Sequence, residues 1–396
     1  ISDLTAMPLA NASLLDEGPA AAEAMLMFWH ARSRAQVKAG VKKFFVANDV
    51  FPQSIEVIKT RAHFQGIEVV VDDVNNFDCS EEYFGILLQC PNQFGEIVDN
   101  RAKVAAWKEK GMQVAVAADL LSLTLITPPG EWGADVVLGS NQRFGLPMGF
   151  GGPHAGYFAT TEAYKREMPG RIIGISVDAL GNPAFRLALQ TREQHIKREK
   201  ATSNICTAQA LLAIMSGFYA LYHGPEGLIE IAHHINCLAG KLSSELAKLG
   251  VKQLNKHFFD TLLFELPEGA CTCKVKEVAE KHCMTFRIID KQHFGISLDE
   301  TTAREDINEI GQVVAEALGK QHEELVCDPN CQKFSGIPAE MQRTSKFMQA
   351  PMFFKYRSET DMMRYMKKLE NRDLSLNRCM IPLGSCTMKL NPATSM

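Results

Sequence analysis

The chain has 396 residues, of which 46% are hydrophobic and 22% charged, and its formal net charge is -4. This is the composition of a globular protein that can bury a sizeable core. The small net charge gives no reason to expect nucleic acid or an anionic membrane surface as a partner. No apolar run reaches the roughly 18 residues of a membrane span, and no signal or transit peptide can be read.

From residue 12 to about residue 225, short apolar runs alternate between helical and strand-like patterns. Such alternation predicts a mainly parallel sheet covered by helices on both faces. In chain order we expect a helix at 20–33, a strand at 43–48, a helix at 55–63, strands at 67–71 and 85–89, a helix at 97–110 and a strand at 114–118. Residues 205–222 predict a longer helix, apolar nearly all round and therefore buried.

A turn at Gly224-Pro225 is expected to end that helix, and a smaller α+β module should follow. Its expected elements are a helix at 228–249, antiparallel strands at 258–266, 284–289 and 295–298, and a helix at 303–318. Low periodicity then predicts a linker, followed by a charged helix at 361–371. We therefore expect a large domain at 1–225, a small domain at 226–320, a linker at 321–360 and a separate segment at 361–396.

The cysteine content bears on the redox state and on metal binding. The eleven cysteines are an odd number scattered through the expected helices and strands, which predicts reduced thiols and no disulfide framework. Cys271-Thr-Cys273 and the pair Cys327 and Cys331 lack a matching His or Cys pair at zinc-site spacing. We therefore expect no metal site.

The most informative stretch lies between Asp135 and Tyr157, where a strand-like run leads into a polar turn and a glycine-rich segment. This arrangement resembles pyridoxal-phosphate (PLP) enzymes of the aspartate-aminotransferase fold, whose turn carries the lysine that binds the cofactor. Gln142 stands at the lysine position, and an amide cannot form a Schiff base with an aldehyde. Asp119 ends a buried strand where such enzymes hold the pyridine nitrogen.

Each of these polar residues also has a simpler interpretation. Asp16 and Glu17 precede an alanine-rich helix, where carboxylates cap free amides and would repel a cofactor phosphate. Asp119 is as readily explained by a local hydrogen bond at the strand end. Arg143 and His154 flank the polar turn, and we expect each to be solvated or structurally paired.

The chain resembles, in collinear order throughout, the amino-terminal half of glycine decarboxylase, the P-protein of the glycine cleavage system. Beside the Gln142 stretch, the resemblance is carried by residues 11–18, 187–196, 201–212, 295–300 and 380–392. In that family the first half lacks the lysine and a homologous second half carries it, in a separate subunit or in the same chain. The resemblance implies an α/β fold of type I with a large domain and a smaller α+β domain. It also implies that this chain is a fragment whose residues 361–396 cross into the second half.

The function implied by the resemblance is PLP-dependent decarboxylation of glycine, with transfer of the aminomethyl group to the lipoyl arm of the carrier H-protein. PLP would be held by the second half, and this chain would be non-catalytic and would shape the partner's site. The implied partners are the second half and H-protein, in a dimer of halves or a higher oligomer. The implied compartment is the mitochondrial matrix in a eukaryote or the cytoplasm in a bacterium.

Residues 202–204 precede the expected helix at 205–222, where hydroxyls and free amides can bind an anion or simply cap the helix. In dimers of this fold the equivalent hydroxyl contacts the partner's PLP phosphate. The resemblance therefore implies cofactor contacts across the interface from Thr202, Asn204 and Thr207.

Two further groups are candidates for the substrate channel. Arg192 and His195 lie in a basic run that is usually a solvated face, but that would suit glycine carboxylate or an acidic lipoyl carrier. The family also implies that four residues near the C-terminus approach the second half's PLP, unless they form an irregular interface loop. These are Ser385, Cys386, Thr387 and Lys389. No base is evident to activate the Cys386 thiol.

Two other functions stay open. A divergent aminotransferase or cysteine-desulfurase-like enzyme would need a lysine at or near position 142, and Lys165 lies too far beyond the glycine-rich segment. A pseudoenzyme interaction module would fold alone and bind a partner, with no catalysis in the complex.

Overall fold

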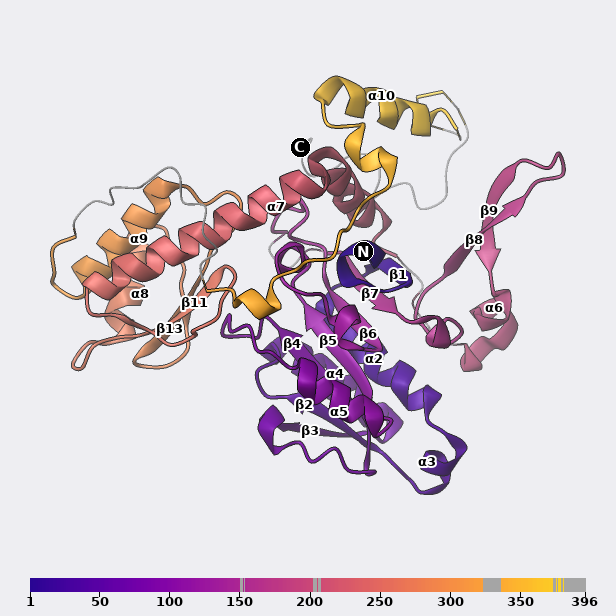
Figure 1. Cartoon of the computed structure of the whole chain (residues 1–396), viewed down its shortest axis with the longest axis horizontal. Helices are drawn as coiled ribbons and strands as arrows, with labels where there is room; N and C mark the ends of the chain where they lie inside the picture. The colour runs from indigo at the N-terminus through magenta and orange to yellow at the C-terminus, as the bar shows by residue number, and fades with distance from the viewer. Residues whose placement is uncertain are drawn as a thin grey trace.

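The structure is a computed structural model that describes residues 1–149, 152, 154–201, 205, 208–322, 336–372, 375, 377, 378 and 380. A large α/β unit holds the first part of the chain. A long helix leads from it to a smaller α+β unit, and a two-stranded hairpin projects from the opposite side (Figure 1).

The large unit is built around a seven-stranded sheet of order β1-β7-β6-β5-β4-β2-β3. Strands β2 to β6 are mutually parallel, whereas β7 runs antiparallel to both β6 and β1. The expected parallel strands are confirmed, and the antiparallel edge is an addition. The strands are β1 (Leu9–Leu14), β2 (Lys43–Ala47), β3 (Glu68–Asp72), β4 (Tyr83–Cys90), β5 (Gln113–Ala118), β6 (Val136–Ser140) and β7 (Gly156–Thr160).

Small apolar residues let a central helix lie close to this sheet. Helix α2 (Glu17–Ala31) packs on strands β4 to β7, and four of its alanines are fully buried. Central strands such as β5 are apolar on both faces because both faces are covered. The remaining helices of this unit are α1 (Ser2–Thr5), α3 (Arg34–Lys38), α4 (Pro52–Gln65) and α5 (Arg101–Glu109).

Helix α7 (Ala210–Lys248) departs from the prediction in two ways. It begins at Ala210 and not at residue 205. Its first turns are also partly exposed to solvent, since Leu211 is 57% and Ile214 53% exposed. The expected break is confirmed, because Gly224 has φ 64° and Pro225 follows it. None of the helices in the described ranges combines the length and apolar composition needed to cross a bilayer.

The small unit confirms the predicted α+β module. Its antiparallel sheet has the order β10-β11-β13-β12, and two helices pack on each other beside α7. The elements are β10 (Lys252–Gln253), β11 (Thr261–Glu265), α8 (Thr272–Lys281), β12 (Arg287–Ile288), β13 (His293–Ser297) and α9 (Arg304–Ala317).

The expectation that the thiols are reduced is wrong for Cys271 and Cys273. Cys271 and Cys273 form a disulfide at the start of α8, where their Cα atoms lie 5.2 Å apart, within the range that a disulfide can span. The turn into the helix brings these two thiols together, which spacing alone did not indicate.

Two segments between the main units were poorly predicted. Strands β8 (Ile172–Val177) and β9 (Pro183–Ala188) form a separate hairpin, followed by α6 (Gln194–Lys197). Within the expected linker, residues 336–357 run across the large unit, where Arg343 donates to the carbonyl oxygens of Leu4 and Leu123. Helix α10 (Glu359–Glu370) follows, as expected.

Candidate functional site

The carboxyl ends of the neighbouring parallel strands β5 and β6 face a cavity of about 250 Å³. Ligands of open α/β sheets bind at this edge. Asp119 directly follows β5, Gln142 and Arg143 follow β6, and Asp260 of the small unit closes the cavity from the other side. The sequence-predicted position of the missing lysine therefore lies in the cavity.

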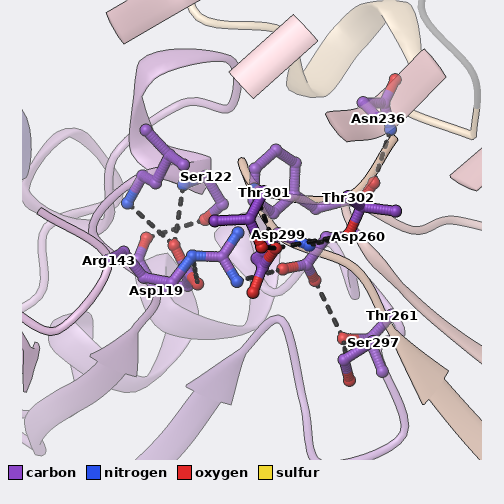
Figure 2. Close-up of polar contacts among 12 residues, drawn as sticks. Asp119, Ser122, Arg143, Asn236, Asp260, Thr261, Ser297, Asp299, Thr301 and Thr302 are labelled. Atoms are coloured by element: carbon purple, nitrogen blue, oxygen red, sulfur yellow. Dashed lines mark hydrogen bonds and ion pairs between the residues drawn. The ribbon is translucent and has the colours of Figure 1, made fainter. Parts of the chain in front are cut away.

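The Arg143 guanidinium binds two carboxylates that come from different units of the fold (Figure 2). Its Nη1 lies 2.6 Å from Asp260 Oδ2, and its Nε lies 3.7 Å from Asp119 Oδ2. Burial lowers the pKa of Arg143, but Asp260 and Asp119 raise it by more, so the net shift is upward. Arg143 is thus a buried cation held by anions, which confirms the structurally paired alternative.

Asp119 is engaged by local groups as well as by Arg143. Its Oδ1 accepts hydrogen bonds from the backbone amides of Leu121 and Ser122, at 2.8 Å and 2.9 Å. The predicted local hydrogen bond at the strand end is therefore confirmed. The local hydrogen bonds thus occupy Oδ1, while Oδ2 makes the 3.7 Å contact with Arg143.

Asp260 is 6% exposed and belongs to a polar cluster at the entrance of β11. Thr261 Oγ1 donates to Asp260 Oδ1 at 2.9 Å, and it also lies 2.9 Å from Ser297 Oγ (Figure 2). Burial raises the pKa of Asp260, and the charge of Arg143 opposes that rise. This carboxylate depends on Arg143 for its charge to be tolerated.

Glu17, in the first turn of α2, lines the same cavity. Burial raises the pKa of Glu17 to about 7, and repulsion from the nearby Asp119 adds to the rise. The neighbouring Asp16 is the N-cap of α2, but the expected capping hydrogen bond from its side chain is not formed. Burial raises the pKa of Asp16, while the charge of His154 opposes the shift.

The residues present do not fit PLP. Among the described residues that line the cavity none is a lysine, and Gln142 cannot form the covalent link. Three carboxyl groups, of Glu17, Asp119 and Asp260, face a single guanidinium, so a phosphate dianion would meet net repulsion. Figure 2 shows Arg143 extended between Asp119 and Asp260, where its Nη1 pairs with Asp260 and its buried Nε and Nη2 have no hydrogen-bond partner among the described residues.

The other predicted site residues are placed differently or lie outside the described residues. The candidates outside them are Thr202, Asn204, Thr207, Ser385, Cys386, Thr387 and Lys389. Arg192 is 6% exposed and points inward, where its Nε donates to the carbonyl oxygen of Arg166 at 2.9 Å and its Nη2 to that of Met168. His195 is exposed on α6. The structure therefore does not bring these two together with Gln142.

Sequence reasoning missed Asp260 and the burial of Glu17. Asp260 lies more than one hundred residues from Arg143, and nothing in its local sequence separates it from a surface aspartate. Only the packing of the small unit against the large one produces the pair.

Comparison with known proteins gives the family. The "Glycine cleavage system P-protein" family matches residues 1–314. Glycine dehydrogenase (decarboxylating) from Flavobacterium johnsoniae is 54% identical over 396 residues, which cover all of this chain and 41% of that protein. This chain thus spans about two fifths of the length of such relatives.

Comparison with solved structures supports the same family. A crystal structure of glycine decarboxylase (P-protein) in inhibitor-bound form is 31% identical, with a TM-score of 0.73 over 80% of this chain and 73% of that one. An aspartate aminotransferase from Thermus thermophilus is 18% identical, with a TM-score of 0.52 over 78% of this chain and 84% of that one, a likeness of fold alone. The predicted type I fold of PLP-dependent enzymes is confirmed, and the chain belongs to the glycine cleavage system P-protein family.

Proposed function

We propose that this chain is the non-catalytic part of glycine dehydrogenase (decarboxylating), and that it completes the active site of a lysine-bearing second half. The observation that carries the proposal is the cavity at the carboxyl ends of β5 and β6, where Gln142 lies, no described lining residue is a lysine, and Arg143 lies between Asp119 and Asp260. Membership of the P-protein family supports the reaction, and the contents of the cavity support the division of roles.

The electrostatics of the cavity support a structural role for it. Asp260 is buried, so separating it from Arg143 would leave a buried carboxylate without its cation, which costs several kcal/mol. A ligand that displaced Asp260 from Arg143 would incur that cost before any gain. The ion pairs around the cavity thus hold the small unit against the large one. We propose that the residues of the cavity have a structural role and do not bind a ligand.

Catalysis would reside in the second half, whose PLP would supply the electron sink for loss of CO2 from glycine. The aminomethyl group would then pass to the lipoyl arm of H-protein. For this chain we propose contacts with the partner's phosphate from Thr202, Asn204 and Thr207, and an approach to the partner's site by Ser385, Cys386, Thr387 and Lys389. His195, exposed beside the hairpin, remains a candidate for the surface that admits the carrier.

The aminotransferase or cysteine-desulfurase alternative has less support. It requires a lysine within reach of the ring, and the described lining residues contain none. The interaction-module alternative is distinguished by activity, because it predicts no catalysis in the complex of this chain with its partner. Loss of activity on Thr202→Ala in a reconstituted enzyme would argue against it.

Exchange of the glycine carboxyl group with bicarbonate, assayed with PLP and lipoylated carrier, tests the proposal. The samples are this chain, the lysine-bearing half and their mixture, and we expect activity only in the mixture. Thr202→Ala should lower the activity of the mixture, with Ser243→Ala on the small-unit end of α7 as the matched hydroxyl control. Exchange by this chain alone, or a PLP adduct on any of its lysines after borohydride reduction, would refute the division of roles.

A further inference from the structure

The hairpin of β8 and β9 has one wholly apolar face. In its antiparallel register Ile173 lies opposite Leu187, Ile175 opposite Phe185, and Val177 opposite Pro183. Directly opposed residues share a face of a two-stranded sheet, so these six side chains form a single surface, which we call the arm face. The other face carries small or polar side chains at five of its six positions, including Arg186.

The arm face is not covered by the described part of the chain. Ile175 is 77% exposed, Phe185 76%, Val177 67% and Ile173 59%, and Leu180 at the tip is 87% exposed. Figure 1 shows β8 and β9 projecting clear of the large unit. A two-stranded hairpin is marginally stable in water, and an apolar patch of this kind marks an interaction surface.

The base of the hairpin is firmly attached, which argues against a loosely placed loop. Arg192 donates to the carbonyl oxygens of Arg166, Met168 and Gly170, just before β8 begins. This ties the segment that leaves the hairpin to the segment that enters it. The chain therefore holds an apolar arm outward from a fixed base.

The surroundings of the arm indicate its partner. Its first residues, Ile172 and Ile173, line a cavity of about 540 Å³ together with Ile205, Ala208 and strand β1. Ile205 and Ala208 directly flank the residues proposed to contact the second half's phosphate. The arm thus continues the proposed interface between the halves.

The composition of the arm face favours a permanent partner over a transient one. Obligate interfaces resemble a divided hydrophobic core, whereas surfaces for transient partners are more polar. The arm face carries no charged residue, so it does not suit an acidic carrier. More than half of the length of the F. johnsoniae relative lies outside the part that matches this chain, which leaves ample protein to supply the partner surface.

We propose that the β8–β9 arm clasps the lysine-bearing half, inserting Ile175 and Phe185 into an apolar surface there. This inference rests on the proposed function.

Hydrogen exchange gives a direct test on wild-type protein. Amides of residues 172–188 are measured in this chain alone and after addition of the second half, with the exposed end of α4 around Phe64 as the reference segment. We expect exchange in the arm to slow at least about tenfold on association, and exchange in the reference segment to stay unchanged, because the interface would exclude water from the hairpin.

A variant gives an independent test. Ile175→Ser combined with Phe185→Ser should weaken association of the halves at least about tenfold in sedimentation experiments, since each buried side chain of this size changes an equilibrium constant by that much or more. Phe64→Ser is the matched control, because Phe64 is also exposed, at 81%. The thermal midpoint of this chain alone should not change in either variant.

The outcomes separate this inference from the proposed function. In one outcome the mixture is active in carboxyl exchange while the arm amides stay unprotected or the arm variant binds the second half normally. That result overturns the assignment of the arm to the interface, but it leaves the half-enzyme proposal intact. A wild-type pair with neither association nor activity overturns both. Protection that rises with the concentration of this chain alone would make a second copy the occupant, and it would overturn the assignment to the second half.

Discussion

The cavity that contains Gln142 differs from the β8–β9 arm in one respect. Charged side chains in the cavity are paired within the chain, whereas apolar side chains of the arm are left uncovered by the described residues. In the cavity, the charge of Arg143 is balanced within the chain by Asp260 and the nearby Asp119, although its buried Nε and Nη2 have no hydrogen-bond partner among the described residues. In the arm, Ile173, Ile175, Val177 and Phe185 are each more than half exposed among the described residues. The charged groups at the expected cofactor position are thus paired within the chain, whereas the apolar arm is exposed and could bind a protein partner.

This contrast separates two uses of one fold. Removing the lysine alone would have left a polar cleft with an unpaired Asp119, whereas the ion pairs convert the cleft into a joint between the large and small units. Each prediction below alters one side of this comparison.

The largest expected effect comes from breaking the joint. Arg143→Met leaves Asp119 and Asp260 without their cation, and we expect the free energy of unfolding to fall by about 4 kcal/mol in urea titrations. The control is Arg171→Met, an exposed arginine 3.9 Å from Glu193, which should cost less than about 1 kcal/mol. Adding Asp260→Asn to Arg143→Met should recover part of the loss. A loss of less than about 1 kcal/mol in the free energy of unfolding for Arg143→Met would contradict the claim that these ion pairs hold the two units together.

The pH dependence of stability should report on Glu17. Its pKa is about 7 in the folded chain, against 4.5 for a free glutamate side chain, so the folded state keeps a proton that the unfolded state releases. Stability should therefore fall as pH rises from about 5 to 7 and then level off. Glu17→Gln should remove this slope and gain about 3 kcal/mol at pH 8.

The control for this titration is Glu56→Gln, which alters an exposed carboxyl on α4. Urea unfolding at several pH values between about 5 and 8 measures the slopes. Parallel curves for wild type and Glu17→Gln would show that the carboxyl is not buried as the structure has it.

The anchor of the arm should have a smaller effect. Arg192→Met removes three hydrogen bonds to backbone carbonyl groups, and we expect a loss of about 2 kcal/mol together with faster proteolysis within residues 171–188. Arg186→Met, in the exposed part of the same hairpin, is the matched control and should change neither. Unchanged proteolysis in Arg192→Met would mean that the arm is held by other contacts.

Much of the fold followed from sequence periodicity, and the site followed only in part. Strands such as β2 and β5 were predicted because buried parallel strands are continuous apolar runs. Gln142 was placed correctly because strand, turn and glycine-rich segment follow one another along the chain. Asp260 was not predicted, since its role is created by the contact between two units of the fold.

The misses have physical causes too. The hairpin of β8 and β9 was not predicted, although Ile173, Ile175 and Val177 alternate with smaller residues before a turn at Asp178–Gly181. The start of α7 was predicted to be buried because its sequence is apolar nearly all round, but Leu211 and Ile214 are exposed.

The smallest predicted effect tests the floor of the cavity. Tyr157 is fully buried, and its hydroxyl donates to the carbonyl oxygen of Ala118 at 2.8 Å, at the end of β5. Tyr157→Phe should cost about 1 kcal/mol in urea unfolding, because the carbonyl loses its side-chain donor and nothing else moves. Tyr222→Phe, which alters an exposed tyrosine on α7, should cost nothing measurable. A much larger cost at Tyr157 would mean that this hydroxyl also positions Asp119, which directly follows Ala118, and the joint would then extend into the sheet.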